Sequence, residues 1–153
     1  MEPIESMKNF ELILAPLAER FEWRGEHRLD VFLPVNNLFR VVETVMSHGW
    51  QYLSSITGVD LPPTEDRDAE GQVELLYHFC EMADILTLRI QVPYCNPVAQ
   101  SICPLIPAAT LYEREIIEMF GVTLEGTTST DRLLLPDDWP VGVYPLRKSF
   151  KGL

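Results

Sequence analysis

The sequence lacks a long apolar segment. No uninterrupted apolar run approaches the roughly 20 residues that a bilayer-spanning helix needs. The first residues, MEPIESMKNFE, also lack the basic, apolar and small-residue order of a secretory signal. We therefore expect a cytoplasmic protein that contacts a membrane only through partners.

Basic residues are scarce, because 12 Lys and Arg stand against 23 Asp and Glu and give a formal net charge of -11. Such a charge disfavours binding to phosphate backbones and to anionic lipid, so we expect no nucleic-acid partner. The few basic residues gather near the C-terminus at Arg147, Lys148 and Lys151. This local reversal of charge predicts a docking segment.

Cysteine and histidine are also scarce, with three of each. None of them stands at the C-x-x-C or H-x-x-x-H spacing of a metal site, and no glycines form the G-x-G-x-x-G pattern of a dinucleotide site. The sequence therefore predicts no metal ligands, no cofactor-binding residues and no disulfide framework. We expect the three cysteines to be buried, reduced thiols: Cys80, Cys95 and Cys103.

What the sequence does contain is an ordinary globular composition, with 153 residues, 46% hydrophobic and 23% charged. A chain of this length buries roughly 68 to 70% of its unfolded surface in one core. Apolar residues at three- and four-residue spacing predict helices, and alternating ones predict strands. The expected helices span residues 4–20, 38–48 and 111–120, with a short helical piece at 98–103. The expected strands span residues 28–33, 50–57, 72–79 and 85–92.

These elements predict an α+β fold. The two strands at 72–79 and 85–92 pair as a hairpin, and residues 61–71 form a solvated loop rich in Pro and acids. We expect a single domain over residues 1–140, with a mixed, mostly antiparallel sheet and helices packed on one face. Residues 141–153 are expected to form an extended C-terminal docking tail.

The third expected helix is short and densely charged. Thr110 and Glu113 match a capping box, and Gly121 supplies the stop signal. Arg114 and Glu118 stand four residues apart and could pair on an exposed face. For the expected helix at 38–48, the two asparagines at positions 36 and 37 similarly predict an N-cap.

Neither cap nor pair explains Glu115, so both a partner contact and an ordinary solvated surface remain open for it. Carboxylate-pair catalysis is disfavoured, because sequence neighbours such as Asp137 and Asp138 point in different directions. The tail VYPLRKSF differs from a random segment: a proline holds it extended, and an apolar residue and two basic ones follow.

Three ordered motifs carry a family resemblance. They are E-R-E-x-x-x-x-F-G from Glu113, R-L-L-L-P-D-D-W from Arg132, and P-L-R-K from Pro145. Together they resemble the C subunit family of proton-pumping NADH:quinone oxidoreductase, respiratory complex I. The upstream segments YLSSITGVDLP and ELLYHF are similar to sheet strands of the same family.

The resemblance implies a cofactor-free structural subunit of the peripheral arm. Its partners would be the large subunit at the quinone site and an iron–sulfur subunit, at the inner face of the cell membrane. Iron–sulfur clusters and a flavin or nickel–iron centre would belong to those partners. The resemblance assigns partner contacts and no catalysis to eight residues: Glu113, Arg114, Glu115, Arg132, Pro145, Leu146, Arg147 and Lys148.

Two departures point to a variant of the family. Gly126 to Thr130 lacks the His and Pro of the usual turn, and the sequence ends five residues after Lys148. Both features are similar to the equivalent small subunit of energy-converting [NiFe] hydrogenases. A free-standing carboxylate-dependent hydrolase and a general adaptor are the alternatives from other classes. We expect Glu115→Ala or Arg147→Ala to leave the isolated fold nearly intact and to weaken assembly.

Overall fold

The computed structural model of the chain describes residues 3–65 and 70–153, so part of the loop expected at 61–71 lies outside the described residues. Its helices are α1 (Pro3–Leu14), the single 3-10 turn η1 (Val35–Asn37), α2 (Leu38–Ser47) and α3 (Ala109–Phe120). Its strands are β1 (Arg20–Trp23), β2 (Arg28–Phe32), β3 (Tyr52–Leu61), β4 (Gln72–Glu81), β5 (Asp84–Pro93), β6 (Val98–Gln100) and β7 (Thr123–Glu125).

The main sheet has five strands in the order β1-β2-β5-β4-β3. Every pairing in it is antiparallel except that of β2 with β5, which is parallel. The expected hairpin is β4–β5, joined by a tight turn in which Met82 has a positive φ. The small pair β6–β7 is parallel. The prediction of a mixed, mostly antiparallel sheet is therefore confirmed.

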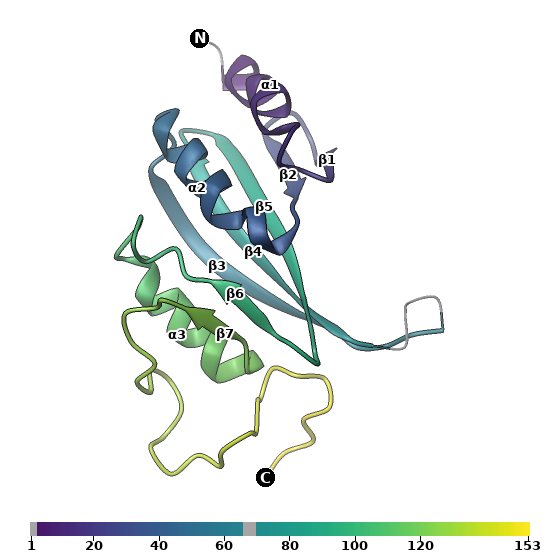
Figure 1. Cartoon of the computed structure of the whole chain (residues 1–153), viewed down its shortest axis with the longest axis vertical. Helices are drawn as coiled ribbons and strands as arrows, with labels where there is room; N and C mark the ends of the chain where they lie inside the picture. Colours follow the sequence, from purple (N-terminus) through teal and green to yellow (C-terminus); the bar gives the residue numbers. More distant parts are fainter. Residues whose placement is uncertain (1–2, 66–69) are drawn as a thin grey trace.

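One face of the main sheet is apolar and the other is polar. Leu75 and Tyr77 of β4 lie opposite Ile90 and Leu88 of β5, and all four side chains are buried. The three helices cover this face, as expected (Figure 1). The sheet thus separates a helix-covered core from a face that no helix of the described chain covers.

On the uncovered face, charged side chains link neighbouring strands through hydrogen-bonded ion pairs. Arg89 on β5 donates two hydrogen bonds to Glu74, at 2.7 and 3.2 Å, and a third to Asp30 at 2.8 Å. Both carboxylates are buried, so the guanidinium neutralises groups that would be costly to leave unpaired. This network joins β2, β4 and β5 and makes the sheet a stable platform for the helices.

Close packing brings α3 against β3, the last strand of the sheet. A Cβ atom on Gly58 would lie 2.3 Å from the ring of Phe120, which is buried at the end of α3. Glycine at this strand position therefore lets the helix approach the sheet. At the other end of the core, Phe10 of α1 packs edge-to-face on Trp50 with ring centroids 5.5 Å apart.

Two predicted elements are wrong. Residues 98–103 do not form a helical piece, because Val98–Gln100 pairs with Thr123–Glu125 as β6 and β7. This long-range pairing outweighs the local pattern. The first helix ends at Leu14 instead of residue 20: the Leu14 carbonyl accepts two turn hydrogen bonds, Pro16 follows, and β1 begins at Arg20.

One of the two predicted N-caps is wrong. Thr110 lies inside α3, whose N-cap is Ala108, and no side chain caps the helix. Asn37 is the N-cap residue of α2, as predicted, but its side chain makes no capping bond, because its amide donates to the Leu17 carbonyl at 2.8 Å. Gly121 is confirmed as the end of α3, with a left-handed φ of 70°.

The cysteines have three different environments. Cys103 is buried, as predicted, but Cys80 is half-buried and Cys95 is exposed. Cys95 is exposed because it follows β5 in a surface turn. In the described part of the chain, no helix is long and apolar enough to cross a membrane.

Candidate functional site

The charged residues of α3 are the natural starting point, and most of them do not face solvent. Glu113 has 0% and Glu118 has 6% of its surface exposed. The helix lies between β3 and the C-terminal segment 126–150, so its polar side chains have protein on several sides (Figure 1). The prediction of an exposed charged face is therefore wrong for these two glutamates.

Glu113 anchors the turn that follows β6. Its Oε1 accepts a hydrogen bond from the Ile102 amide at 2.9 Å. Its Oε2 accepts hydrogen bonds from Ser101 Oγ at 2.7 Å and from Cys103 Sγ at 3.2 Å. The carboxylate thus satisfies three donors inside the core, and a buried carboxylate is tolerated only with such partners.

The neighbouring Tyr77 is the one buried side chain with an unsatisfied polar atom in the described structure. Burial raises the pKa of its hydroxyl, and the nearby Glu113 and Cys103 raise this pKa further. The Tyr77 hydroxyl therefore stays protonated at neutral pH, and it cannot serve as a base there.

Arg114 and Glu118 lie one turn apart on α3 and together hold the segment 131–135. Arg114 donates from Nε to the Asp131 carbonyl at 2.9 Å and from Nη2 to the Arg132 carbonyl at 2.6 Å. Glu118 accepts from the amides of Leu133, Leu134 and Leu135, at 2.6, 2.9 and 3.4 Å.

We call this pair of side chains the loop clasp. The arginine binds the carbonyls of the segment, and the glutamate binds its amides. The predicted ion pair between Arg114 and Glu118 is therefore wrong, because each side chain is engaged by main-chain groups. The clasp gives an irregular segment a fixed position without any helix or strand.

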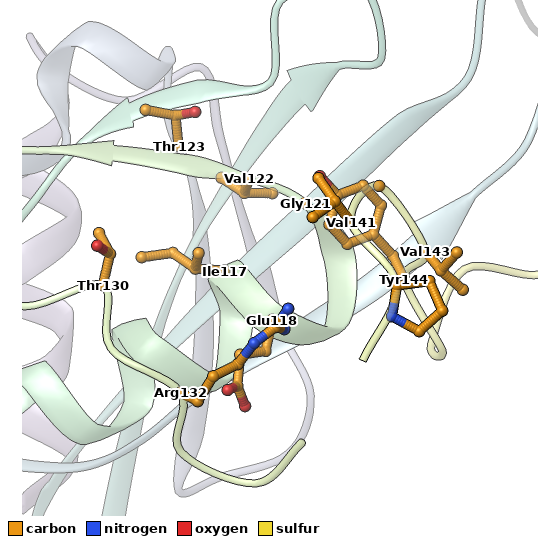
Figure 2. Close-up of a pocket in the computed structure, with 12 residues that line it drawn as sticks. Ile117, Glu118, Gly121, Val122, Thr123, Thr130, Arg132, Val141, Val143 and Tyr144 are labelled. Carbon is orange, nitrogen blue, oxygen red and sulfur yellow. The ribbon is translucent and has the colours of Figure 1, made fainter. Parts of the chain in front are cut away.

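Beside the clasp is a pocket of about 340 Å³ between the end of α3 and residues 140–144. Figure 2 shows the Arg132 side chain extending from its loop toward α3, where it lines this pocket with Glu118. Arg132 also donates to the Trp139 carbonyl at 3.3 Å. Among the described residues that line the pocket, Glu118 alone carries a carboxylate. No carboxylate pair therefore converges there.

The P-L-R-K motif closes the C-terminal end of α3. The Leu146 amide donates to the Met119 carbonyl at 3.2 Å. Arg147 Nε donates to the Phe120 carbonyl at 2.6 Å. These bonds satisfy carbonyls that a helix end would otherwise leave without partners.

The same motif reaches back to β3 through Asp60. The Lys148 amide donates to Asp60 Oδ2 at 2.8 Å, and Arg147 Nη1 lies 3.9 Å from Oδ1. Arg147 also stands over the Tyr94 ring, 4.3 Å from its centroid, and the Tyr94 hydroxyl donates to Asp60. The tail is thus fixed to its own domain by main-chain groups and one arginine.

Other parts of the C-terminal half point outward. We call their large exposed apolar side chains the outer strip: Leu111, Leu134, Val141, Leu146 and Leu153. The side chain of Lys148 is exposed as well and makes no ion pair in the described part of the chain. Pro145 is half-buried and precedes the bonded residues.

Glu115 lines a separate groove of about 290 Å³ between α3 and β3. The residue is half-buried, and no hydrogen bond or ion pair of the described residues engages its carboxylate. The structure therefore divides the eight predicted partner-contact residues. Four act inside the chain: Glu113, Arg114, Arg132 and Arg147. Glu115, Leu146 and Lys148 keep side chains available to a neighbour, and the half-buried Pro145 belongs to neither group.

Sequence reasoning missed Asp60 and Ser101 and misjudged Glu118. The spacing of Glu118 from Arg114 gave a signal, because it places both side chains on one helix face. Asp60 gave none, since its partner Lys148 stands 88 residues further along the chain. Ser101 became significant only once the turn after β6 was placed beside α3.

Arg147→Ala is expected to lower the free energy of unfolding by about 1–2 kcal/mol, because it removes a charged donor from the Phe120 carbonyl and a cation from Asp60. This replaces the expectation that the isolated fold tolerates the change. Urea denaturation of the purified variant measures the loss. Lys148→Ala is the matched control and should change little, so equal effects of the two would contradict the assignment.

Comparison with known proteins places these observations in a family. The sequence matches the family model described as "Respiratory-chain NADH dehydrogenase, 30 Kd subunit" over residues 31–153. It is 32% identical over 122 residues to the C subunit of the NADH-quinone oxidoreductase of Moorella thermoacetica (strain ATCC 39073 / JCM 9320), covering 78% of this chain and 77% of that protein.

It is also similar to members of other complexes. Formate hydrogenlyase subunit 5 of Escherichia coli (strain K12) is 34% identical over 129 residues, covering 82% of this chain but 22% of that protein. A chain in the solved structure of the membrane-bound sulfane sulfur reductase, an archaeal respiratory membrane complex, has a TM-score of 0.82 and 28% identity. That match covers 97% of this chain and 87% of the other. The chain thus spans less than two thirds of the length of some relatives.

Proposed function

This chain belongs to the family of the respiratory-chain NADH dehydrogenase 30 kDa subunit, and we propose that it serves as a non-catalytic structural subunit of a complex I-type, membrane-associated redox complex. In this role it would sit in the peripheral arm and hold other subunits in position. It would carry no cofactor of its own.

The outer strip is the observation that carries this proposal. Val141 is 96% exposed, Leu134 is 61% exposed and Leu146 is 52% exposed. Exposure of these large apolar side chains to water is unfavourable, and a protein partner that covers them removes that cost. The loop clasp and Arg147 hold this segment in place before any partner arrives, and such preorganisation lowers the entropic cost of binding.

We propose the large quinone-site subunit and an iron–sulfur subunit as the partners. Association with them would place the chain at the inner face of the membrane. The sulfane sulfur reductase neighbour is itself part of a respiratory membrane complex, which supports a multi-subunit setting. Glu115, Leu146 and Lys148 are the motif residues whose side chains would contact a partner, while the others shape the segment.

A second candidate is the equivalent subunit of a hydrogenase-type complex. The identity with formate hydrogenlyase subunit 5 favours it. Both candidates assign the chain the same structural role. They differ in the electron donor and acceptor, which belong to other subunits.

A free-standing hydrolase is disfavoured by where the carboxylates lie. Glu113 is engaged by three donors in the core, Glu118 by main-chain amides, and Glu115 lies in a different groove. Asp137 and Asp138 are exposed and line neither the pocket beside the clasp nor the groove at Glu115. Hydrolysis by a carboxylate pair needs two carboxyl groups facing one substrate, and this arrangement does not provide them.

Purification of the tagged chain from its native membranes tests the proposal. We expect it to bring down partner subunits that contain iron together with flavin or nickel. Leu146→Asp should reduce their recovery, whereas Leu12→Asp on α1, which alters a side chain that is 79% exposed, should not. A metal-free soluble pair, or turnover of a substrate by the purified chain alone, would contradict a structural role in a redox complex.

A further inference from the structure

We propose that the edge of β3 and the groove beside it bind an extended strand of a partner subunit that carries a Lys or Arg residue. The proposal rests on the proposed structural role and specifies where and how a partner is held. The strand would add to the main sheet next to β3, with its basic side chain at Glu115.

The edge of β3 is open along its middle. β3 is the last strand of the sheet and pairs with β4 on one side only. In an antiparallel ladder, alternate residues turn their main-chain N–H and C=O groups away from the partner strand. The Tyr112 hydroxyl donates a hydrogen bond to the carbonyl of Ser54, at the point where the register of β3 shifts. From residue 55 to residue 59, no other main-chain segment of the described structure bonds to this edge.

Such an edge is a template for another strand, and proteins that leave one open commonly use it for recognition. β3 contains ten residues and no proline or lysine that would block pairing. Thr57 and Val59 are at least partly exposed. The edge therefore keeps the features that permit strand addition.

The groove beside the edge supplies side-chain recognition. Residues 55–58 of β3 form one wall, and Ile116 and Phe120 of α3 contribute buried apolar surface. Leu146 closes the groove from the tail, where its amide is bonded to the Met119 carbonyl. An added strand would place alternate side chains into this groove, as in other examples of strand addition.

Glu115 favours a partner strand that carries a positive charge. Glu115 lines the groove and is half-buried, and its carboxylate forms no ion pair with any residue of the described structure. A partly desolvated carboxylate gains most from a Lys or Arg that arrives with the ligand. The net charge of -11 also favours the approach of a basic segment.

A second copy of this chain is a poorer occupant of the same edge. Pairing of two β3 edges about a twofold axis would bring two Glu115 carboxylates toward one interface and join two chains of charge -11. Like charges at an interface oppose association. We therefore assign the edge to a different polypeptide.

Hydrogen exchange and photo-crosslinking on the purified native complex test the strand. If the edge is paired, all amides from residue 55 to 59 should exchange slowly; in an open edge, about two or three of them would exchange within seconds. A photoreactive benzoylphenylalanine at Thr57 should capture a partner peptide that contains Lys or Arg.

Charge reversal tests the role of Glu115. Glu115→Lys should lower the recovery of partner subunits at least about tenfold relative to Glu43→Lys, which alters an exposed glutamate on α2. Intact complexes with rapid exchange at 55–59, capture of a second copy, or equal recovery with both variants would each overturn the inference and leave the proposed function standing. Purification without any redox subunit would instead remove the proposed function, and the inference with it.

Discussion

Glu113→Ala is expected to lower the free energy of unfolding by about 3–4 kcal/mol, the largest loss among the motif residues, because it strips three buried donors of their acceptor. The Ile102 amide and the Ser101 hydroxyl would be left in the core without the carboxylate that accepts their hydrogen bonds. The truncation also leaves a cavity beside α3, which adds to the loss.

Urea denaturation followed by circular dichroism measures this effect on the purified chain. Glu115→Ala is the matched control two residues away on the same helix, and it should not alter the midpoint measurably, because its carboxylate has no partner in the described structure. Glu113→Gln should fall between them, since it keeps the side-chain shape and one oxygen acceptor. Equal stability of the Glu113 and Glu115 alanine variants would refute a core-anchoring role for Glu113.

The sequence predicts the main sheet well where strands lie next to each other in the chain. The alternation in β4 and β5 identifies both strands and their hairpin, because side chains on a strand alternate between the two faces of a sheet. The parallel pairing of β2 with β5, and that of β6 with β7, joins distant segments that have no local signal. The short β1 was missed because its four residues are too few to show a clear alternation.

For the candidate site, the sequence predicts the family but not the roles of individual residues. The three motifs correctly identify the family, and the resemblance that they carry is confirmed by the match over residues 31–153. The roles of individual residues depend on contacts that the motifs do not encode. Glu113 fits a capping box by spacing, yet its partners are in a turn about a dozen residues earlier. Arg147 resembles a docking residue, yet it bonds to the end of α3.

Glu118→Ala is expected to detach the segment 131–135 from α3, because three main-chain amides lose the carboxylate that accepts their hydrogen bonds. The loss of charged hydrogen bonds should cost about 2–3 kcal/mol of stability in that region. Hydrogen exchange of the amides of residues 133–135 should accelerate by a factor of roughly 30 to 150. This factor follows because each loss of about 1.4 kcal/mol corresponds to a tenfold change in rate. Exchange in β4 and β5 should remain slow.

The same variant separates the stability of the fold from the function of the outer strip. Leu134 belongs both to the clasped segment and to the strip, so loss of the clasp should also reduce recovery of partner subunits. Glu125→Ala is the control. It removes an exposed glutamate of β7 and so tests whether the loss of any one acidic residue near α3 has the same effect. If Glu118→Ala accelerates exchange at 133–135 while partner recovery is unchanged, the segment is not a docking surface. Partner contact would then depend on β3 and the groove at Glu115.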